Sequence, residues 1–493
     1  MAFPRTTSNQ RQKEGQAVCK RCALRWMMAG LIAEALACLA VGRAWADEPA
    51  TTPKNVLFIA IDDLNDWTGF LGGHPQAKTP NLDRLAAQGV VFERAYCSAP
   101  ACNPSRASLL TGLHPTSTGV YLNSQPWRPV LPEAVTLPQY FQAAGYDVRG
   151  GGKIFHGRYL DPDSWDEWFP LASATRPEPD DRPVNGIANT GHFDWGPLDV
   201  PDAEMPDAKV VSWAIDRLNK SEGDKPFFLA VGLYRPHLPW YVPRPYFDQH
   251  PVSEVTLPEV LDNDLEDLPP AGIAMAKPNG DHRKVIEARQ WEKAVQGYLA
   301  SIAFADAQIG RLLDALEASP HAGETVIVLW GDHGWHLGEK QHWRKFALWE
   351  EATRVPLVVN VPGVTQPGGR SQRTVTLLDL YPTLIELAGL PPKQDLEGKS
   401  FVPLLRDPGA AWDRPAVTTH GRGNHAVRSE RWRFIRYANG DEELYDHEAD
   451  PQEWKNLADD PRYSSVKQEL AGWLPKREAP NAPRETGDDG GIH

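Results

Sequence analysis

The sequence predicts an α/β fold, with a mixed, mostly parallel sheet flanked by helices and a smaller C-terminal α+β subdomain. Two observations indicate this class. Four short apolar runs rich in β-branched and aromatic residues recur along the chain, and helical patterns lie between them. Strands that are covered on both faces form continuous apolar runs. Strands that alternate with helices are typical of an α/β sheet.

The strands and helices of the predicted sheet follow from these patterns. The predicted strands are 55–61 (NVLFIAI), 227–231, 325–329 and 355–361. A helix is expected at 81–88, where Leu82 and Leu85 are three residues apart, and a longer one at 291–316, whose apolar residues share one face. Ligands of such sheets bind at the carboxyl ends of the strands, so the residues directly after each run are candidates for the site.

Two regions interrupt the pattern of alternating strands and helices, and the C-terminal part has a different pattern of short strands and one helix. Residues 160–205 and 251–279 are rich in Pro, Asp and Gly without periodicity, which is typical of functional insertions or mobile surface. Short strands are expected within 426–435 and at 443–445, and a closing helix at 463–474. We therefore expect a C-terminal subdomain at 411–480, followed by a disordered tail at 481–493.

Residues 1–46 do not fit this fold. Basic residues precede an apolar run at 26–42, and Ala-Trp-Ala follows at 44–46, which is the order of an export signal cleaved after Ala46. A disordered or buried N-terminal segment is the alternative. The run is shorter than the ~20 apolar residues that span a bilayer, and it contains Glu34, so no stable membrane anchor is expected. The protein is predicted to be exported, to the periplasm or the cell exterior.

Composition excludes several classes of protein. The 493 residues include 51 Lys and Arg against 65 Asp and Glu, a formal charge of −14, and removal of the leader changes this charge to −19. Nucleic-acid binding requires clustered basic residues, so no nucleic-acid partner is expected. A hydrophobic content of 41% argues against wholesale disorder. Three of the five cysteines lie in the leader; Cys97 and Cys102 remain and could form one disulfide.

Acidic residues follow two of the predicted strands. Asp62 and Asp63 come directly after the first strand, and Asp332 and His333 follow the strand at 325–329. Adjacent carboxylates repel each other unless a cation lies between them, although an isolated Asp-Asp pair more often marks a turn or helix start. Three carboxylates and an imidazole at one sheet edge predict a divalent cation site. Oxygen ligands favour Ca²⁺ or Mg²⁺, and the histidine leaves Mn²⁺ or Zn²⁺ open.

Between these acidic motifs lies the string CNPSRASLLTG at 102–112. It describes a helix start with Cys102 at the N-terminal end, a location that favours anions and lowers thiol pKa values. Arg106 lies one turn along and is expected to reach back to the same place. The alternative is a structural cysteine beside an ordinary helix start.

This string resembles the signature of type I sulfatases, which belong to the alkaline phosphatase-like superfamily. Further motifs match along nearly all of the mature chain: IDDL after the first strand, GGKIFH at 151–156, RPHLP at 235–239 and GDHGWHLGEK at 331–340. The Lys-x-x-His and Asp-His elements look most like the iduronate-2-sulfatase branch. The resemblance implies an alkaline phosphatase-like catalytic domain at 54–410.

The resemblance also implies the chemistry of Cys102. In this family the cysteine is oxidised after translation to formylglycine, whose hydrated aldehyde is the nucleophile, so a formylglycine-generating maturation enzyme is an implied partner. A metal is implied as well, Ca²⁺ with Mg²⁺ or Mn²⁺ possible. Its implied ligands are Asp62, Asp63, Cys102 as formylglycine, Asp332 and His333.

The remaining site residues are carried over in the same way. Arg106 would hold the hydrated aldehyde, and His156 would support the formylglycine. Lys153, His237 and Lys345 would contact the sulfate oxygens. His237 is also a candidate general acid for the leaving alcohol, because imidazole titrates near neutral pH. Thr136 matches a site threonine, and Trp335 is a candidate for stacking on a sugar ring.

Some positions depart from the pattern. Arg235 stands where relatives often carry lysine, Phe346 where the iduronate enzyme has tyrosine, and His336 where it has a small residue; these three are expected to face the sugar. The C-terminal region adds a basic cluster that either lines the pocket rim or forms a surface patch: His420, Arg422, His425 and Arg428.

The predicted function is hydrolysis of sulfate esters on a sulfated saccharide, with release of inorganic sulfate. A phosphonate or phosphate ester hydrolase of the same superfamily is the first alternative. A non-catalytic, exported glycan-binding protein is the second.

Overall fold

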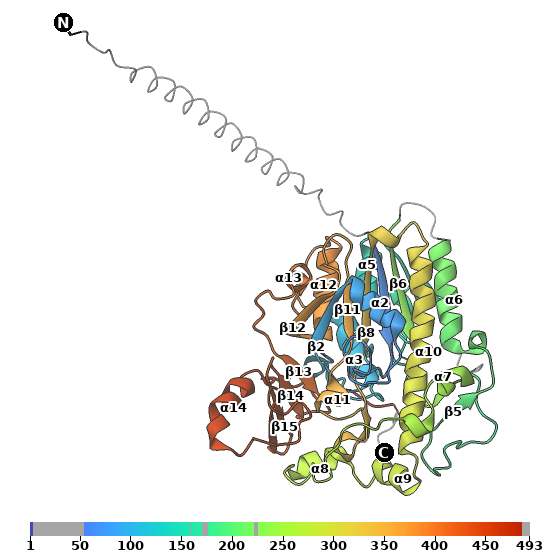
Figure 1. Ribbon diagram of the computed structural model, residues 1–493, viewed down its shortest axis with the longest axis vertical. Helices are drawn as coiled ribbons and strands as arrows, with labels where there is room; N and C mark the ends of the chain where they lie inside the picture. Colours follow the sequence, from blue (N-terminus) through green and yellow to red (C-terminus); the bar gives the residue numbers. More distant parts are fainter. Residues whose placement is uncertain (3–53, 158, 170–175, 221–224, 486–493) are drawn as a thin grey trace. The chain divides into compact units, whose positions relative to one another are not determined.

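The computed structural model describes residues 1–2, 54–157, 159–169, 176–220 and 225–485 (Figure 1). The predicted export signal thus falls outside the described residues, its first two positions excepted. From residue 54 onward the described residues belong to one compact unit. No helix in this part of the chain combines the length and the apolar character that crossing a membrane requires.

An eight-stranded sheet forms the centre of this unit (Figure 1). Its spatial order is β12-β2-β11-β8-β1-β6-β3-β4. Neighbouring strands run parallel except at β11, which is antiparallel to both β8 and β2. The prediction of a mixed, mostly parallel sheet is therefore confirmed. The strands are β1 Asn55–Ile61, β2 Val90–Tyr96, β3 Asp147–Gly152, β4 Glu167–Phe169, β6 Phe227–Leu233, β8 Thr325–Gly331, β11 Leu357–Asn360 and β12 Gly369–Thr376.

Helices cover both faces of this sheet, because its central strands are apolar on both sides. Successive side chains of β1 point to opposite faces: Phe58 belongs to one core and Ile59 to the other. Helices α2, α6 and α10 pack on the Ile59 side, and α3, α5, α12 and α13 on the Phe58 side. The helices are α2 Pro80–Gln88, α3 Cys102–Thr111, α4 Pro115–Thr118, α5 Leu137–Ala143, α6 Pro206–Asn219, α7 Arg244–Asp248, α8 Pro270–Ala276, α9 Asp281–Glu287, α10 Trp291–Glu317, α11 Glu350–Thr353, α12 Leu380–Leu387, α13 Val402–Arg406 and α14 Ser464–Ala471.

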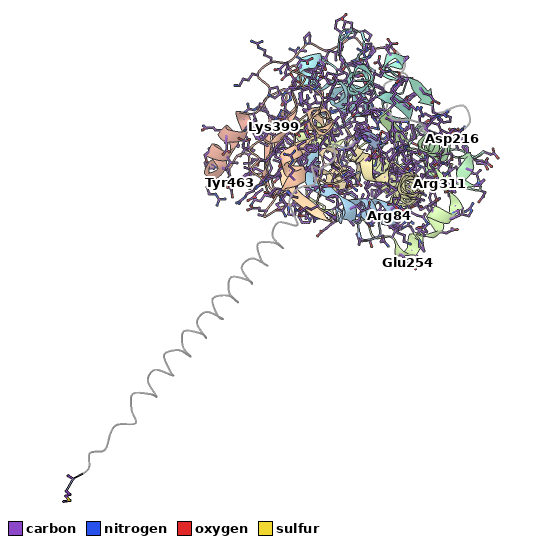
Figure 2. The ribbon with its side chains drawn as sticks, turned by 90° about the horizontal axis from the view of Figure 1, so that it is seen from above. Arg84, Asp216, Glu254, Arg311, Lys399 and Tyr463 are labelled. Carbon is purple, nitrogen blue, oxygen red and sulfur yellow. The ribbon has the colours of Figure 1, made fainter. Side chains whose placement is uncertain are left out.

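The longest helix, α10, has a broad buried face, as its apolar pattern predicts. Its solvent side is tied to α2 by ion pairs in which Arg84 contacts Asp314 at 2.7 Å and Glu317 at 3.0 Å. Figure 2 labels Arg84 of α2 and, on α10, Arg311. Such exposed pairs contribute about 0–1 kcal/mol each, so the buried face holds the helix in place.

The four predicted strands all exist, but the sequence patterns miss half of the sheet. Strands β2, β3, β4 and β12 contain charged residues or glycines, for example DVRGGG in β3 and GRSQRTVT in β12. The irregular regions also contain regular elements, namely β4 and β5 (Trp195–Leu198) in the first and α8 in the second. Strand β5 pairs with β7 (Trp240–Pro243), and β9 (His336–Leu337) pairs with β10 (Trp343–Arg344).

The C-terminal part forms a four-stranded antiparallel sheet, as predicted. The region expected to be strand at 426–435 is a hairpin, and α14 is shorter than the expected 463–474. The first strand is held against the main domain, since Thr419 N donates to Ser98 O at 2.9 Å and the Thr418 hydroxyl donates to Cys97 O at 2.6 Å. The strands are β13 Ala416–Thr419, β14 His425–Arg428, β15 Trp432–Arg436 and β16 Glu442–Asp446.

Part of the predicted disordered tail is ordered. Ala482 is buried, its amide donates to Gly119 O at 2.8 Å, and its carbonyl accepts from Gln125 Nε2 at 2.8 Å. Glu485 N donates to Ser124 O at 2.8 Å. Backbone groups along the main domain therefore fix residues 481–485, although this segment has no regular structure.

A histidine at the junction with the C-terminal sheet gives a prediction for pH stability. His114 Nδ1 lies 2.9 Å from Thr116 Oγ1 and its Nε2 lies 3.2 Å from Val417 O. Burial lowers the pKa of His114 to about 4, so between pH 6.5 and 4 the unfolded chain binds a proton at His114 more readily than the folded chain does. We predict that the free energy of unfolding falls between pH 6.5 and 4, with His114 contributing roughly 1–3 kcal/mol. Urea denaturation across this range measures the effect.

The variant His114→Gln provides the comparison for this prediction. It lacks the titrating group, so its stability should decline less over the same range. Parallel curves for the variant and the wild type would show that His114 contributes nothing.

Candidate active site

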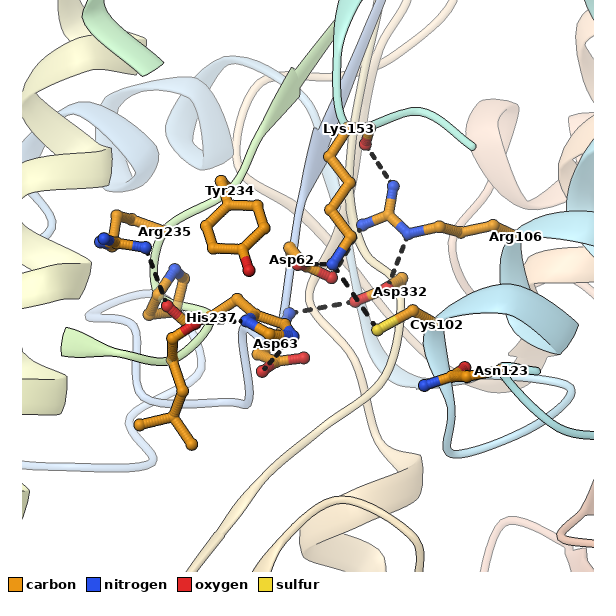
Figure 3. A network of polar contacts seen from close by, with 12 residues as sticks. Asp62, Asp63, Cys102, Arg106, Asn123, Lys153, Tyr234, Arg235, His237 and Asp332 are labelled. Carbon is orange, nitrogen blue, oxygen red and sulfur yellow. Dashed lines mark hydrogen bonds and ion pairs between the residues drawn. The ribbon is translucent and has the colours of Figure 1, made fainter. Parts of the chain in front are cut away.

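The carboxyl ends of four adjacent parallel strands converge on one place. Asp62 follows β1, Asp332 follows β8, Lys153 follows β3 and His237 follows β6. Because these strands are neighbours in the order β8-β1-β6-β3, their ends bring together side chains that are up to 270 residues apart in sequence. Figure 3 shows the carboxylates, Lys153 and His237 directed toward a common centre beside Cys102.

Two glycines allow Lys153 to enter this centre. Gly152 ends β3 with φ +76°, and a Cβ there would lie 2.0 Å from Gly232 O. A Cβ on Gly232 would lie 2.3 Å from the Lys153 carbonyl carbon. Side chains at either position would separate β3 from β6 and move Lys153 away from the centre.

The start of α3 holds Cys102 in place. Cys102 is the first residue of the helix and is completely buried. The next amide, Asn103 N, donates to Asn123 Oδ1 at 3.0 Å, and the Ser105 hydroxyl donates to Asp332 O at 2.5 Å. The helix start is thus tied both to the loop before α5 and to the segment after β8.

Arg106 connects the helix to both acidic strand ends. Its Nε donates to Asp332 Oδ2 at 2.8 Å, and its Nη2 donates to Asp62 Oδ1 at 3.1 Å. Its third nitrogen donates to the carbonyls of Lys153 and Ile154. All of these side chains are fully buried, so removal of Arg106 would leave unpaired charges in the interior.

Two ammonium groups and an imidazole surround the Cys102 sulfur. Lys345 Nζ lies 2.9 Å from Sγ, His333 Nε2 lies 3.3 Å from it and Lys153 Nζ lies 3.8 Å from it. Each lysine also pairs with a carboxylate: Lys345 with Asp63 at 2.7 Å and Lys153 with Asp62. Burial alone would lower the pKa of each lysine, but the carboxylates raise it above the ordinary value.

The pKa of Cys102 contradicts the expectation from the helix start. Burial, followed by the charge of Asp62, raises the pKa of the thiol to about 12, although Lys153 and Lys345 act in the opposite direction. The N-terminus of α3 does not outweigh the loss of hydration. Cys97 is not bonded to Cys102: both are free and buried, and the possible disulfide is absent.

The donor set fits a divalent cation. Single ligand atoms of Asp62, Cys102, Asp332 and His333 all lie within 4.8 Å of one another, and a second such group adds Asp63 and His237. Asp63 Oδ2 is buried and has no hydrogen-bond partner in the described part of the chain. A buried carboxylate oxygen without a partner is costly, and a cation would satisfy it.

His237 lies beside this donor set in a defined tautomer. Its Nδ1 lies 2.7 Å from Leu238 O, so Nδ1 carries the hydrogen and Nε2 faces Asp63 Oδ2 at 3.8 Å. Burial, then Lys153 and Lys345, lower the pKa of His237 well below its usual range. The expectation that this imidazole titrates near neutral pH is therefore wrong for the protein without substrate.

His156 lies in the same cationic surroundings. Burial and the charges of Lys153, Lys345 and Arg106 lower its pKa well below the usual range. Its Nδ1 is buried and has no partner among the described residues. The site thus contains a neutral imidazole with an unpaired nitrogen close to these cations.

Two predicted substrate residues have structural roles instead. The Thr136 hydroxyl caps α5 through Gln139 N at 3.3 Å and lies 2.7 Å from Ser164 Oγ. Trp335 is 1% exposed, and Lys345 Nζ lies 5.6 Å from its ring centroid. Thr136 thus fixes the start of helix α5. The buried Trp335 ring packs near the ammonium group of Lys345 and has no exposed face on which a sugar could stack.

Two of the three residues that depart from the family pattern are also buried. Arg235 is 1% exposed, and His336 packs edge-on against His342 with 4.9 Å between ring centroids. Both side chains are thus buried, and their expected contact with the sugar stays a prediction. Phe346 is partly exposed.

The sequence patterns missed some neighbours of the site. The ring of His192 stacks on His237 with centroids 5.9 Å apart and 16° between the planes, and Lys153 Nζ lies 4.9 Å from the Tyr234 ring centroid. His192 lies in the irregular region, which offered no periodic signal. Tyr234 precedes the RPHLP motif directly, so that motif could have pointed to it.

Comparisons with known proteins agree with this geometry. The sulfatase family model matches residues 54–390, and the model for the C-terminal part of N-sulphoglucosamine sulphohydrolase matches residues 338–479. A sulfatase of Formosa agariphila is 40% identical over 446 residues, covering 86% of this chain and 87% of that protein. Human iduronate 2-sulfatase is 32% identical over 425 residues, covering 75% of each.

A solved structure shows the same fold. The phosphonate monoester hydrolase from Silicibacter pomeroyi superposes with a TM-score of 0.73 at 21% identity, covering 85% of this chain and 94% of that one. The expected alkaline phosphatase-like fold is confirmed. The fold and the strand-end site define a hydrolase of anionic esters. With the family match over more than half of its length, the chain belongs to the sulfatase family and is a sulfuric ester hydrolase.

Arg235 is predicted to position His237. Its Nη1 donates to His237 O at 3.0 Å (Figure 3), and its Nε donates to Tyr241 O at 3.2 Å, so one buried guanidinium ties the His237 backbone to strand β7. Arg235→Met should lower kcat for an aryl sulfate roughly ten- to hundredfold, with a smaller change in KM, because the imidazole loses its fixed orientation. Steady-state kinetics measures both constants.

Two further variants control this prediction. Arg235→Lys should restore part of the rate, and Arg311→Met, on the outer side of α10, should leave it unchanged. A merely structural role would be indicated if Arg235→Met lost thermal stability but kept wild-type kcat in the folded fraction.

Proposed function

We propose that this enzyme hydrolyses sulfate esters of a carbohydrate, with a formylglycine hydrate derived from Cys102 as the nucleophile. The observation that carries the proposal is the environment of Cys102. Its sulfur lies at a helix N-terminus, within 3.8 Å of two ammonium groups and within 3.3 Å of an imidazole. A sulfate group at this position would face cations on several sides, which lowers the energy of a transition state with charge on its oxygens.

An aldehyde hydrate suits this place better than a thiol. A thiol that attacked sulfur would form a stable adduct. A geminal diol attacks sulfur with one hydroxyl while the S–O bond to the alcohol breaks. The second hydroxyl then loses its proton, the C–O bond to the sulfate breaks, and inorganic sulfate leaves as the aldehyde forms again. Addition of water to the aldehyde restores the geminal diol, so that one water is consumed in each turnover. Maturation by a formylglycine-generating enzyme is part of this proposal.

Asp62, Asp63, Asp332 and His333 would hold the metal together with the modified residue 102. We propose Ca²⁺, with Mg²⁺ or Mn²⁺ as alternatives, because the ligands are mainly carboxylate oxygens. When bound, the metal supplies Lewis-acid stabilisation of negative charge. It would also compete with Lys153 and Lys345 for the carboxylates and so leave their ammonium groups available to sulfate oxygens.

His237 is proposed to deliver the proton to the leaving alcohol through Nε2. Its pKa is low in the free site because burial and two lysines oppose a positive charge. A bound anionic ester counters those lysines and raises that pKa, so protonation would accompany substrate binding. Arg106 is proposed to hold the hydrate, and His156 to accept a hydrogen bond from it.

A sulfated saccharide is the proposed substrate. Support comes from the likeness to iduronate 2-sulfatase, which extends over three quarters of the chain. Export to the periplasm or the cell exterior is proposed from the order of basic, apolar and small residues in 1–46, and it suits an enzyme that acts on polysaccharides outside the cell.

The nucleophile assignment predicts different effects for the two described cysteines. Cys102→Ala should lower turnover of a sulfated saccharide by roughly a thousandfold or more, because the attacking group is lost. Cys97→Ala is the matched control. Cys97 is equally buried, but the one hydrogen bond of its thiol among the described residues goes to Ala352 O, at 3.9 Å, so its variant should keep most of the rate. Chromatographic detection of released sulfate measures both.

Substrate choice separates this proposal from its alternatives. Release of phosphate or phosphonate by the matured wild type, without release of sulfate, would favour the phosphonate hydrolase alternative. Tight binding of glycans without any turnover would favour the non-catalytic alternative. Sulfate release that survives in Cys102→Ala would contradict the nucleophile assignment.

Metal removal is predicted to separate activity from stability. Without the ion, three carboxylates are already balanced by Arg106, Lys153 and Lys345, so chelation should abolish turnover while the chain stays folded. Added Ca²⁺ should restore the rate and raise the thermal midpoint. Activity assays and thermal denaturation after dialysis against a chelator test this; full activity in metal-free protein would refute it.

A further inference from the structure

An open pocket of about 480 Å³ lies between helix α8 and the C-terminal sheet. Phe346, His420 and Tyr437 supply rings to its lining, and α8 supplies small and apolar side chains. Lys277, directly after α8, is the one residue among its lining with a formal charge. No carboxylate lines the pocket, although the chain as a whole is strongly acidic.

This pocket shares a wall with the catalytic centre. Phe346 follows Lys345, whose Nζ lies 5.8 Å from the Phe346 ring centroid and 2.9 Å from Cys102 Sγ. His342 joins the two sides, because its Nε2 lies 2.8 Å from Lys345 O and its Nδ1 lies 2.9 Å from Ala276 O, one residue before Lys277. Phe346 thus lies both in the lining of the pocket and beside Lys345.

The backbone around this wall is held in an unusual conformation. Arg344, Phe346 and Lys277 have φ values of 74°, 73° and 53°. Left-handed backbone costs a residue other than glycine about 1–3 kcal/mol, and it persists where surrounding structure requires it. Glycine or asparagine usually follows the last turn of a helix, whereas here Lys277 occupies that position.

The ammonium group of Lys277 forms no ion pair with another described residue. Among the described residues no carboxylate lies within 4 Å of it, whereas the nearby Lys340 and Arg344 pair with Asp264 and Asp281 at 2.9 Å and 2.7 Å. His420 Nδ1 is buried and has no partner among the residues that the structure describes. Burial, followed by Lys277 and His342, lowers the pKa of His420 to about 4. The pocket thus offers one free cation and one neutral imidazole. The rest of the predicted basic cluster is engaged elsewhere: His425 with Glu478, Arg428 with Glu350 and Arg422 near Glu478.

We propose that this pocket binds the sugar of the leaving alcohol and that Lys277 pairs with an anionic substituent on that sugar, either a carboxylate or a second sulfate. His420 supplies a hydrogen bond, and the Phe346 ring packs against the sugar. The inference rests on the proposed function for its sulfate position and adds to it the chemical class of the sugar. Attraction between Lys277 and the C-terminal dipole of α8 is the competing explanation for a lysine there.

Binding to the inactive Cys102→Ala protein tests this without any need for turnover. Three sulfated disaccharides that differ at one position of the leaving sugar serve as ligands: one bears a carboxylate, one a second sulfate and one a neutral hydroxymethyl group. Lys277→Gln in this background should weaken binding of an anionic ligand roughly tenfold and leave the neutral ligand within about twofold, the size of one charged hydrogen bond. Calorimetry measures each Kd. Lys293→Gln, on the exposed side of α10, is the matched control and should change nothing.

The ligands also identify the source of the negative charge. Sensitivity of the carboxylate ligand alone assigns an acidic sugar, and sensitivity of the disulfated ligand alone assigns a second sulfate. Lys277→Gly supplies a second variant that tolerates φ 53°, and it should lose the anion preference without losing thermal stability. Equal weakening of all three ligands, or no change in any, would overturn the assignment. Failure of the matured wild type to release sulfate would instead contradict the proposed function, since these binding measurements do not depend on it.

Discussion

The structure depends on a balance of buried charge at the carboxyl end of its central sheet. Three carboxylates and three cations lie together with side chains at most 6% exposed: Asp62, Asp63, Asp332, Arg106, Lys153 and Lys345. Isolated charges in such surroundings cost several kcal/mol each, so the group is stable only as a set. A divalent cation added to this neutral set gives it a net positive charge, which is what an anionic ester requires. With the proposed metal bound, substrate binding and metal binding would therefore be coupled by electrostatics.

The fold serves this balance by delivering charges from distant parts of the chain. Parallel strands place their carboxyl ends on one edge, and α3 points its N-terminus at the same edge from the Phe58 side of the sheet. Close contact between β3 and β6, permitted by Gly152 and Gly232, sets the depth of Lys153. The C-terminal sheet packs beside this edge through β13 and supplies part of the neighbouring pocket. The proposed catalytic and recognition groups thus come from different layers of one compact unit.

The sequence predicts the centre of this arrangement better than its surroundings. Short polar motifs directly after continuous apolar runs located Asp62, Asp332 and His333, because burial on both faces leaves a clear signal. Strands such as β12 carry charged and polar residues in place of a continuous apolar run and were missed. The capping role of Thr136 and the inward position of Arg235 depend on tertiary neighbours, which residue spacing does not encode. The prediction of a lowered pKa for the Cys102 thiol was wrong for the same reason. A helix start can be recognised from the local sequence, but the loss of hydration depends on the whole fold.

The account's central claim concerns the chemical state of residue 102. Mass spectrometry of the peptide that contains this residue, from protein made together with its maturation enzyme, tests that claim most directly. The account predicts the mass of an aldehyde in place of the thiol, in proportion to the specific activity of the preparation. An unmodified cysteine in a fully active preparation would contradict it.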